Sequence, residues 1–122
     1  MTNPTPPPST SIPPDELPTA VRGFLTAHAV HDVAGALAHL APDAVVTDQG
    51  ETFRGAEEVR RFLRQAGSEF TYTTELVGAG RAGEDRWTAA VRIEGDFPGG
   101  VADLTYRFEL RGALVAELHI GP

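Results

Sequence analysis

The side chains of this chain that could do chemistry are carboxylates and imidazoles. The chain has no Cys and no Lys, which excludes thiolate nucleophiles, thiolate metal sites and Schiff-base lysines. Asp48 shares one face of a predicted strand with Ala44 and Val46. Apolar neighbours disfavour a charged carboxylate and raise its proton affinity, which favours Asp48 as a general base. The alternative is an ordinary Asx turn, in which Asp48 accepts hydrogen bonds from the amides that follow it.

Three further side chains could assist Asp48. His28 lies one helical turn after Phe24, so both point to the same side of a predicted helix. A histidine that only fills the core is the alternative for His28. Glu117 and His119 share a face of the last predicted strand, where both could assist Asp48. The alternative is that this face points towards solvent or a subunit interface. The chain has no HxH or HExxH spacing, so we predict neither a metal site nor another cofactor.

Length and charge limit the protein to a few classes. The chain has 122 residues and a net charge of −7, which indicates one domain and argues against binding to nucleic acid or to an anionic membrane. No stretch approaches the roughly 20 apolar residues of a membrane span. Residues 1–14 lack the layout of a signal peptide. We therefore expect a cytoplasmic protein.

The first 14 residues differ in composition from the rest of the chain. They hold six of the ten prolines and one large aliphatic residue, Ile12, so they are expected to form a disordered tail. A proline-rich ligand for another domain is the functional alternative for this segment. The folded domain is expected over residues 15–122.

The periodicity of residues 15–122 predicts helices first and strands afterwards. Helical spacing predicts a helix that ends near Val30, a second over residues 33–40 with Asp32 as its N-cap, and a third over residues 55–66. Alternation predicts strands over residues 44–48, 52–54, 70–77, 87–93, 103–111 and 114–120, with a loop at 78–85. This order predicts an α+β fold with the helices on one face of an antiparallel sheet, which leaves a cavity between the layers.

Residues 41–62 carry a pattern that resembles a known family. The segment reads A-P-D-A-V-V-T-D-Q-G-x-x-x-x-G-x-x-x-V-R-x-F and is similar to the SnoaL-like branch of the nuclear transport factor 2-like superfamily. The resemblance extends over about residues 15–121. It implies a cone-shaped α+β barrel that encloses a largely apolar pocket, and a homodimer formed through the outer face of the sheet.

The resemblance also implies roles for single residues. The ketosteroid isomerases of the superfamily match this chain so that Asp48 falls on their general base, Phe24 on the Tyr of their oxyanion hole and Leu104 on its protonated Asp. Both hydrogen-bond donors are thus replaced by hydrocarbon, which argues against ketosteroid isomerisation itself. The same match implies that the strand face that carries Glu117 and His119 points towards the cavity.

A second, weaker similarity concerns the strand over residues 87–93 and its end. Arg92-Ile93-Glu94 is similar to the Arg-x-Asp of the epoxide-hydrolase branch of the superfamily. Alternation turns Arg92 and Glu94 away from the predicted cavity face, so we do not assign them a role.

Two functions are compatible with these features. The first is an acid–base catalyst of the isomerase or cyclase type, which acts on a small hydrophobic carbonyl compound with Asp48 as the base and His119 or His28 assisting. The second is a non-catalytic protein that binds a hydrophobic ligand in the same pocket. The side chains expected to touch the ligand in either case are Phe24, Phe62, Tyr72, Trp87, Leu104, Tyr106 and Glu117.

Overall fold

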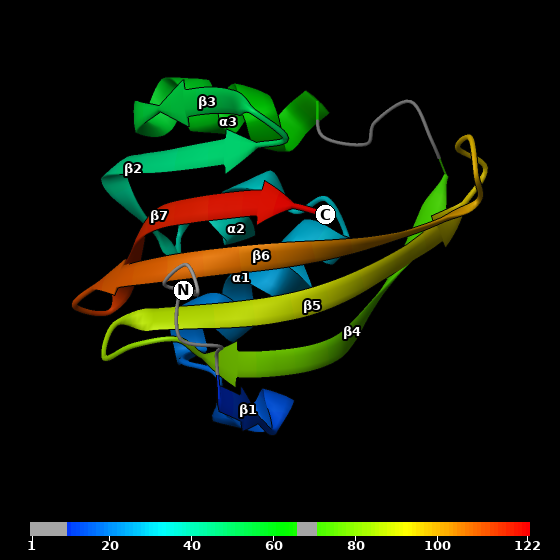
Figure 1. Cartoon of the computed structure of the whole chain (residues 1–122). Coiled ribbons are helices and arrows are strands. Elements are labelled where there is room, and N and C mark those ends of the chain that lie inside the picture. Colours follow the sequence, from blue (N-terminus) through cyan, green and yellow to red (C-terminus); the bar gives the residue numbers. More distant parts are fainter. Residues whose placement is uncertain (1–9, 66–70) are drawn as a thin grey trace, which may run out of the picture.

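A seven-stranded sheet forms the frame of the computed structural model, which describes residues 10–65 and 71–122. The strand order is β1-β4-β5-β6-β7-β2-β3, and only β2 and β7 run parallel to each other. The sheet curves strongly where β4, β5 and β6 rise at one end (Figure 1). The strands are β1 (Thr10–Ile12), β2 (Leu40–Asp48), β3 (Glu51–Arg54), β4 (Tyr72–Arg81), β5 (Arg86–Gly95), β6 (Val101–Arg111) and β7 (Leu114–Gly121).

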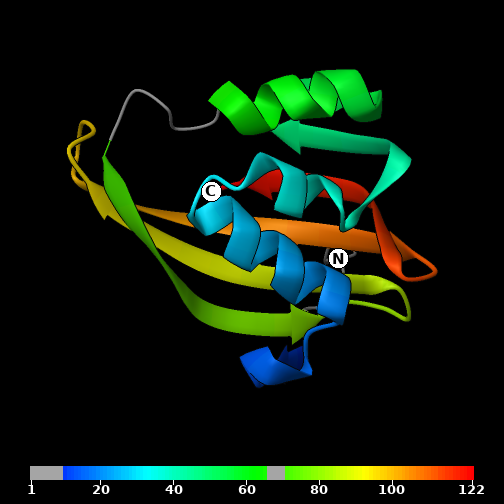
Figure 2. The ribbon, with the colours of Figure 1, turned by 180° about the vertical axis from the view of Figure 1, so that it is seen from behind.

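The helices gather on the concave side of this sheet (Figure 2). They are the short 3₁₀ helix η1 (Pro14–Glu16), then α1 (Thr19–Ala29), α2 (Val33–Leu37) and α3 (Gly55–Gln65). Asp32 caps α2 as predicted, because its Oδ1 accepts a hydrogen bond from the Gly35 amide at 2.9 Å. The expected α+β fold with a cone-shaped sheet over helices is confirmed.

The hydrophobic core lies between the helices and the sheet. Val21 and Phe24 of α1 are completely buried, and the Phe24 ring meets that of Phe108 on β6 edge-on, with the centroids 5.9 Å apart. Val59, Phe62 and Leu63 bring the apolar face of α3 into the same core. One contiguous core therefore fixes the helices against the sheet.

A β-bulge decides which residues of β7 face the core. Val115 and Glu117 pair with consecutive residues of β6, so Ala116 is an extra residue in β7. An extra residue reverses the alternation of the residues that follow it. As a result Leu118 and Ile120 are buried, and the residues between them face the other side of the sheet.

Several element boundaries differ from the prediction, and β2, for example, begins at Leu40 and not at residue 44. Helix α2 ends at Leu37, not at residue 40, because Leu40 already pairs with Val115 of β7. Strand β4 continues to Arg81 through residues 78–81, which we expected in a loop. Val77 is the extra residue of a second bulge. The bulge interrupts the alternation of apolar residues, so the sequence pattern does not indicate that the strand continues beyond it.

The structure also differs from the prediction at the end of the tail that was expected to be disordered. Thr10–Ile12 form β1, which pairs with β4 from Arg81 to Ala79, and Ile12 packs against the core. The main-chain hydrogen bonds of the extended β4 give this segment a partner that its composition does not reveal. Residues 1–9 and the predicted strand and helix ends at 66–70 lie outside the described residues.

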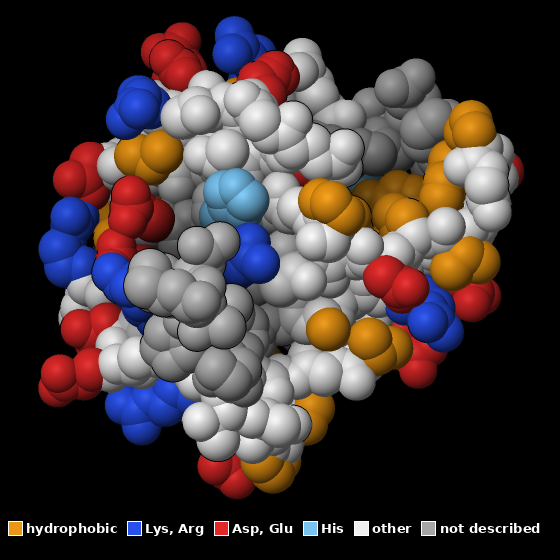
Figure 3. Space-filling model, in the orientation of Figure 1, with side chains coloured by type: hydrophobic (Ala, Val, Ile, Leu, Met, Phe, Trp, Pro, Cys, Tyr) orange, Lys and Arg blue, Asp and Glu red, His pale blue; other side chains and the backbone are white. Residues whose placement is uncertain are grey.

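The outer face of the sheet is polar where β5 meets β6. Arg92 Nε lies 2.9 Å from Asp103 Oδ1, and Arg86 Nε lies 3.2 Å from Glu109 Oε1. Charged side chains are spread over this face, while hydrophobic side chains gather beside its curved end (Figure 3). Dimerisation through this face stays a prediction. None of the helices in the described part of the chain has the length and apolar character needed to cross a membrane.

Candidate functional site

A cavity of about 750 Å³ opens between α1 and the concave face of the sheet. Its wall is mainly apolar and includes Leu25, Val91, Ile93, Leu104 and Ile120. Six of the residues singled out from the sequence line it: His28, Asp48, Phe62, Tyr72, Leu104 and Tyr106. The volume and the apolar wall suit a small hydrophobic molecule.

Asp48 and Tyr106 lie on the same inner face of the sheet and both line the cavity. In the sheet Asp48 is the neighbour of Ile120 on β7, and Ile120 is the neighbour of Tyr106 on β6. Paired residues of adjacent strands share a face, and strands lie about 4.8 Å apart, so the backbones of Asp48 and Tyr106 are separated by about 10 Å. The sheet therefore presents a carboxylate and a phenol to the same volume of the cavity.

The Asp48 carboxyl is half-buried. Burial, and secondarily the negative charge of Glu51, raises its pKa above the ordinary value of 3.8. Residues 10–65 and 71–122 supply no hydrogen bond or ion pair to this carboxyl, so the alternative Asx turn is not formed. Gln49 and Gly50 instead turn the chain into β3 with positive φ angles of 49° and 90°, as in a two-residue hairpin.

Replacing Glu51 with Gln should lower the pKa of Asp48, because the substitution removes a negative charge that disfavours its ionisation. If Asp48 acts as a base, the rate of any reaction that it catalyses rises as the carboxyl ionises. The rising limb of the pH–rate profile should thus move to lower pH in Glu51→Gln. A profile measured with Glu57→Gln, an exposed carboxylate on α3, should match that of the wild type, and an unmoved limb in Glu51→Gln would contradict the assignment.

His28 also reaches the cavity, but as a neutral imidazole. Its ring stacks between those of Phe24 and Phe62, at centroid distances of 5.4 and 6.0 Å. Burial, and secondarily the charge of His31, lowers the pKa of His28 to about 4. At neutral pH His28 can therefore offer one N–H donor and one nitrogen acceptor, but no positive charge.

This buried imidazole makes folding sensitive to mild acid. The unfolded chain binds a proton at His28 near pH 6.5 and the folded chain only near pH 4, so the free energy of unfolding falls as the pH is lowered through this window, with a slope of at most about 1.4 kcal/mol per pH unit. In His28→Phe, which keeps a ring between Phe24 and Phe62, this contribution should disappear. Urea unfolding at pH 7, 6, 5 and 4 measures it, and His119→Gln should retain the wild-type slope.

The bulge in β7 places two of the predicted residues away from the cavity. Glu117 and His119 are exposed on the outer face of the sheet, not turned inward as the match to the ketosteroid isomerases implied. Ala116 reverses that alternation, so Ile120 reaches the cavity in place of His119. On the outer face, Glu117 shares a hydrogen bond with Glu109, which raises the pKa of Glu117.

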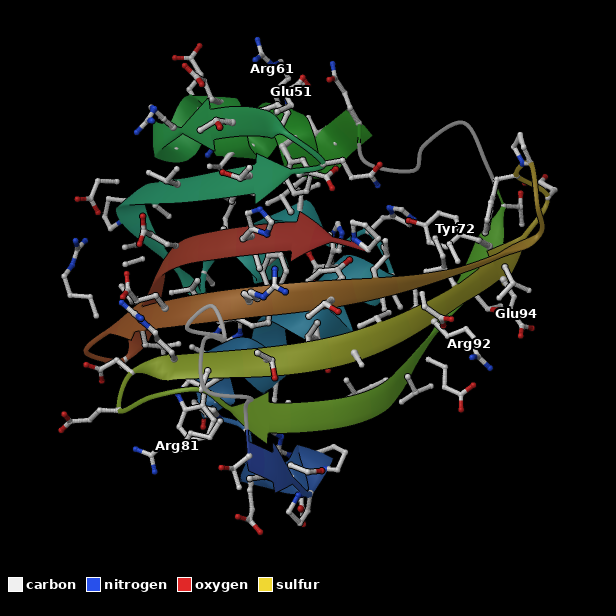
Figure 4. All side chains as sticks on the ribbon, in the orientation of Figure 1. Glu51, Arg61, Tyr72, Arg81, Arg92 and Glu94 are labelled. Atoms are coloured by element: carbon white, nitrogen blue, oxygen red, sulfur yellow. The ribbon has the colours of Figure 1, made fainter. Side chains whose placement is uncertain are left out.

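Two further predicted contacts lie on the inner side but outside the cavity wall. Phe24 is completely buried in the core beneath His28. Trp87 pairs with Phe108 near the opposite end of β5, and the guanidinium of Arg81 lies 4.9 Å from its ring. Arg92 and Glu94 lie on the outer side of β5, as expected, and Tyr72 lies at the start of β4, beside the curved end of the sheet (Figure 4).

The sequence patterns did not indicate which residues line the rim of the cavity. Pro14 and Asp15 of η1 line it together with Arg22 of α1, whose Nη1 donates to the Asp15 carbonyl at 3.4 Å. Phe97 and Pro98 line it from the β5–β6 turn. Turns and a 3₁₀ helix have no periodicity that would reveal such positions. In the described ranges 10–65 and 71–122, no group of three His, Asp or Glu side chains could hold a metal ion.

A curved sheet over helices, with a mainly apolar cavity between them, defines a protein of the nuclear transport factor 2-like class. Within that class the chain belongs to the SnoaL-like domain family, whose family model matches residues 21–118. A search of the curated proteins found no match.

Solved structures agree with this assignment. A candidate polyketide cyclase from Sinorhizobium meliloti is 28% identical and has a TM-score of 0.82, with 90% of this chain and 100% of that chain covered. A protein with a ketosteroid isomerase-like fold from Catenulispora acidiphila, solved with trimethylamine, is 16% identical at a TM-score of 0.74 and coverages of 86% and 85%. A protein from Sphaerobacter thermophilus is 20% identical at a TM-score of 0.73 and coverages of 84% and 91%.

Proposed function

We propose that this SnoaL-like protein catalyses proton transfer next to the carbonyl group of a small hydrophobic compound, as an isomerase or a cyclase. The observation that carries the proposal is the carboxylate of Asp48 in the wall of a mainly apolar cavity, with no hydrogen-bond or ion-pair partner among the residues that the structure describes. A carboxylate with a raised pKa is suited to accept a proton from carbon. The similarity to a candidate polyketide cyclase supports the same class of reaction.

The step that Asp48 would perform is the formation of an enolate. Its carboxylate accepts the proton from the carbon next to the carbonyl, the C–H electron pair becomes the C=C bond, and the carbonyl π electrons move to oxygen. In an isomerase, Asp48 returns the proton to another carbon of the same molecule. In a cyclase, the enolate carbon attacks a second carbonyl of the substrate, and Asp48 gives the proton to the alkoxide that forms.

A non-catalytic ligand-binding protein is the second candidate. The observation that favours it is hydrocarbon at both positions where the ketosteroid isomerases carry oxyanion donors, with Phe24 in the core and Leu104 in the cavity wall. Removing one such donor typically lowers the rate by about 10²–10³-fold. A protein of this kind would bind the carbonyl compound without exchanging its protons.

Deuterium exchange into 2-tetralone distinguishes the two candidates without knowledge of the natural substrate. This bicyclic ketone is small and hydrophobic, and its C1 hydrogens are acidified by both the carbonyl group and the ring. Loss of the C1 proton signal in D₂O is followed by NMR with and without the protein, and binding is measured separately by titration. Catalysis predicts exchange well above the buffer rate, whereas saturable binding with exchange at the buffer rate favours the second candidate.

A further inference from the structure

The hydroxyl of Tyr106 is a polar group in the cavity wall to which the proposed reaction assigns no role. Tyr106 is 6% exposed and lines the cavity from β6. No side chain or backbone group within residues 10–65 and 71–122 forms a hydrogen bond with its hydroxyl. Every fully buried side-chain nitrogen or oxygen in these residues has a partner, so the unpaired hydroxyl must be open to the cavity.

The ring that carries this hydroxyl is held on two sides. It stacks against Phe108 at a centroid distance of 6.2 Å, and His28 meets it at 6.4 Å with an interplanar angle of 61°. Phe108 is itself buried in the core. A donor whose ring is fixed in this way needs little reorganisation when charge develops on a ligand.

The protonation state of Tyr106 suits a donor. Burial, and secondarily the charges of Tyr72 and Asp48, raises its pKa well above the ordinary value of 10. The phenol therefore keeps its proton at neutral pH and next to an ionised Asp48. The influence of Asp48 agrees with the sheet geometry, in which only Ile120 separates the two residues.

We propose that the Tyr106 hydroxyl donates a hydrogen bond to the carbonyl oxygen of the substrate while Asp48 removes a proton from the neighbouring carbon. This assignment rests on the proposed function. Tyr106 would supply the missing oxyanion donor from a different position, two residues beyond Leu104 on the same face of β6. It also limits the substrate to enolisable ketones or related carbonyl compounds, because the same small group must meet both side chains.

The test compares Tyr106→Phe with Tyr72→Phe, which removes the same atom from another tyrosine of the same cavity. Isotope-edited infrared spectroscopy of bound 2-tetralone reports the hydrogen bond directly, since donation to the oxygen lowers the C=O stretching frequency. The wild type and Tyr72→Phe should both show a frequency below that in hexane, and in Tyr106→Phe it should return towards the hexane value. Deuterium exchange should slow by about 10²–10³-fold in Tyr106→Phe. It should keep the wild-type rate in Thr105→Val, which removes a hydroxyl from the neighbouring residue of β6, on the outer face of the sheet.

The outcomes separate this inference from the proposed function. An unchanged frequency in Tyr106→Phe overturns the role of Tyr106, whatever the exchange rates are. A lowered frequency in the wild type without exchange above the buffer rate overturns the proposed catalysis but retains Tyr106 as the carbonyl donor. No binding of the ketone to any of these proteins, each with a wild-type circular dichroism spectrum, overturns both.

Discussion

Asp48→Asn should slow the exchange of the C1 hydrogens of 2-tetralone by about 10²–10⁴-fold, which is the usual contribution of a general base. The amide has nearly the shape of the carboxyl but cannot accept the proton from carbon. Because Asp48 forms no ion pair or hydrogen bond among residues 10–65 and 71–122, the substitution breaks no contact there. The exchange rate is measured by NMR at saturating ketone, and binding should persist.

The same variant should be more stable than the wild type at pH 7. The pKa of Asp48 is raised in the folded state, so the folded chain holds this proton more tightly than the unfolded chain does. Its contribution to stability is therefore greatest in acid and is lost as the pH rises through the folded pKa. A neutral amide removes that cost of ionisation, and the melting temperature of Asp48→Asn should increase while its activity falls.

Asp43→Asn is the matched control on the same strand. Asp43 is exposed, and a hydrogen bond from Arg111 lowers its pKa, so ionisation favours the folded state at neutral pH. This variant should keep the wild-type exchange rate and should not gain stability. Equal exchange by Asp48→Asn and the wild type would rule out Asp48 as the base.

Phe24→Ala should lower the free energy of unfolding by about 3–5 kcal/mol, the range measured when a buried Phe is truncated. Phe24 is completely buried, packs edge-on against Phe108 and supports the ring of His28. A loss of this size is a large part of the roughly 5–15 kcal/mol that stabilises a typical domain. Urea unfolding followed by circular dichroism measures it.

Val77→Ala is the control for this truncation, because Val77 is 50% exposed on the outer side of the sheet. Its change in unfolding free energy should stay within about 1 kcal/mol. A similarly small change in Phe24→Ala would mean that the core collapses around the missing ring. The position at which the ketosteroid isomerases carry a Tyr donor is thus expected to be structural in this chain.

The elements with a strong period could be predicted from the sequence, together with their arrangement. The stripe of Val21, Phe24 and His28 predicted α1, and the spacing of Val59, Phe62 and Leu63 predicted α3. The apolar alternation that ends at Asp48 predicted both β2 and the candidate base in the cavity wall. These patterns are local, so no knowledge of the partner strands was needed.

The residues that could not be predicted depend on pairing between distant segments. The extra residues Val77 and Ala116 are visible only in the register of β4 against β5 and of β7 against β6. Thr10–Ile12 form a strand only because β4 offers them its free edge. Likewise the pairing of Asp48 with Tyr106 through Ile120 depends on three strands from different parts of the chain.

The extra residue in β7 also bears on how roles are transferred between relatives. Because of Ala116, the aliphatic side chain of Ile120 lies on the inner face of β7, and the carboxylate of Glu117 and the imidazole of His119 do not. A relative without this extra residue would have the side chains that match Glu117 and His119 on the inner face of its sheet. An alignment without a gap would then assign catalytic roles to two residues of this chain that lie on its outer face. A one-residue insertion in a terminal strand can therefore change which side chains face the interior of a sheet without replacing any of them.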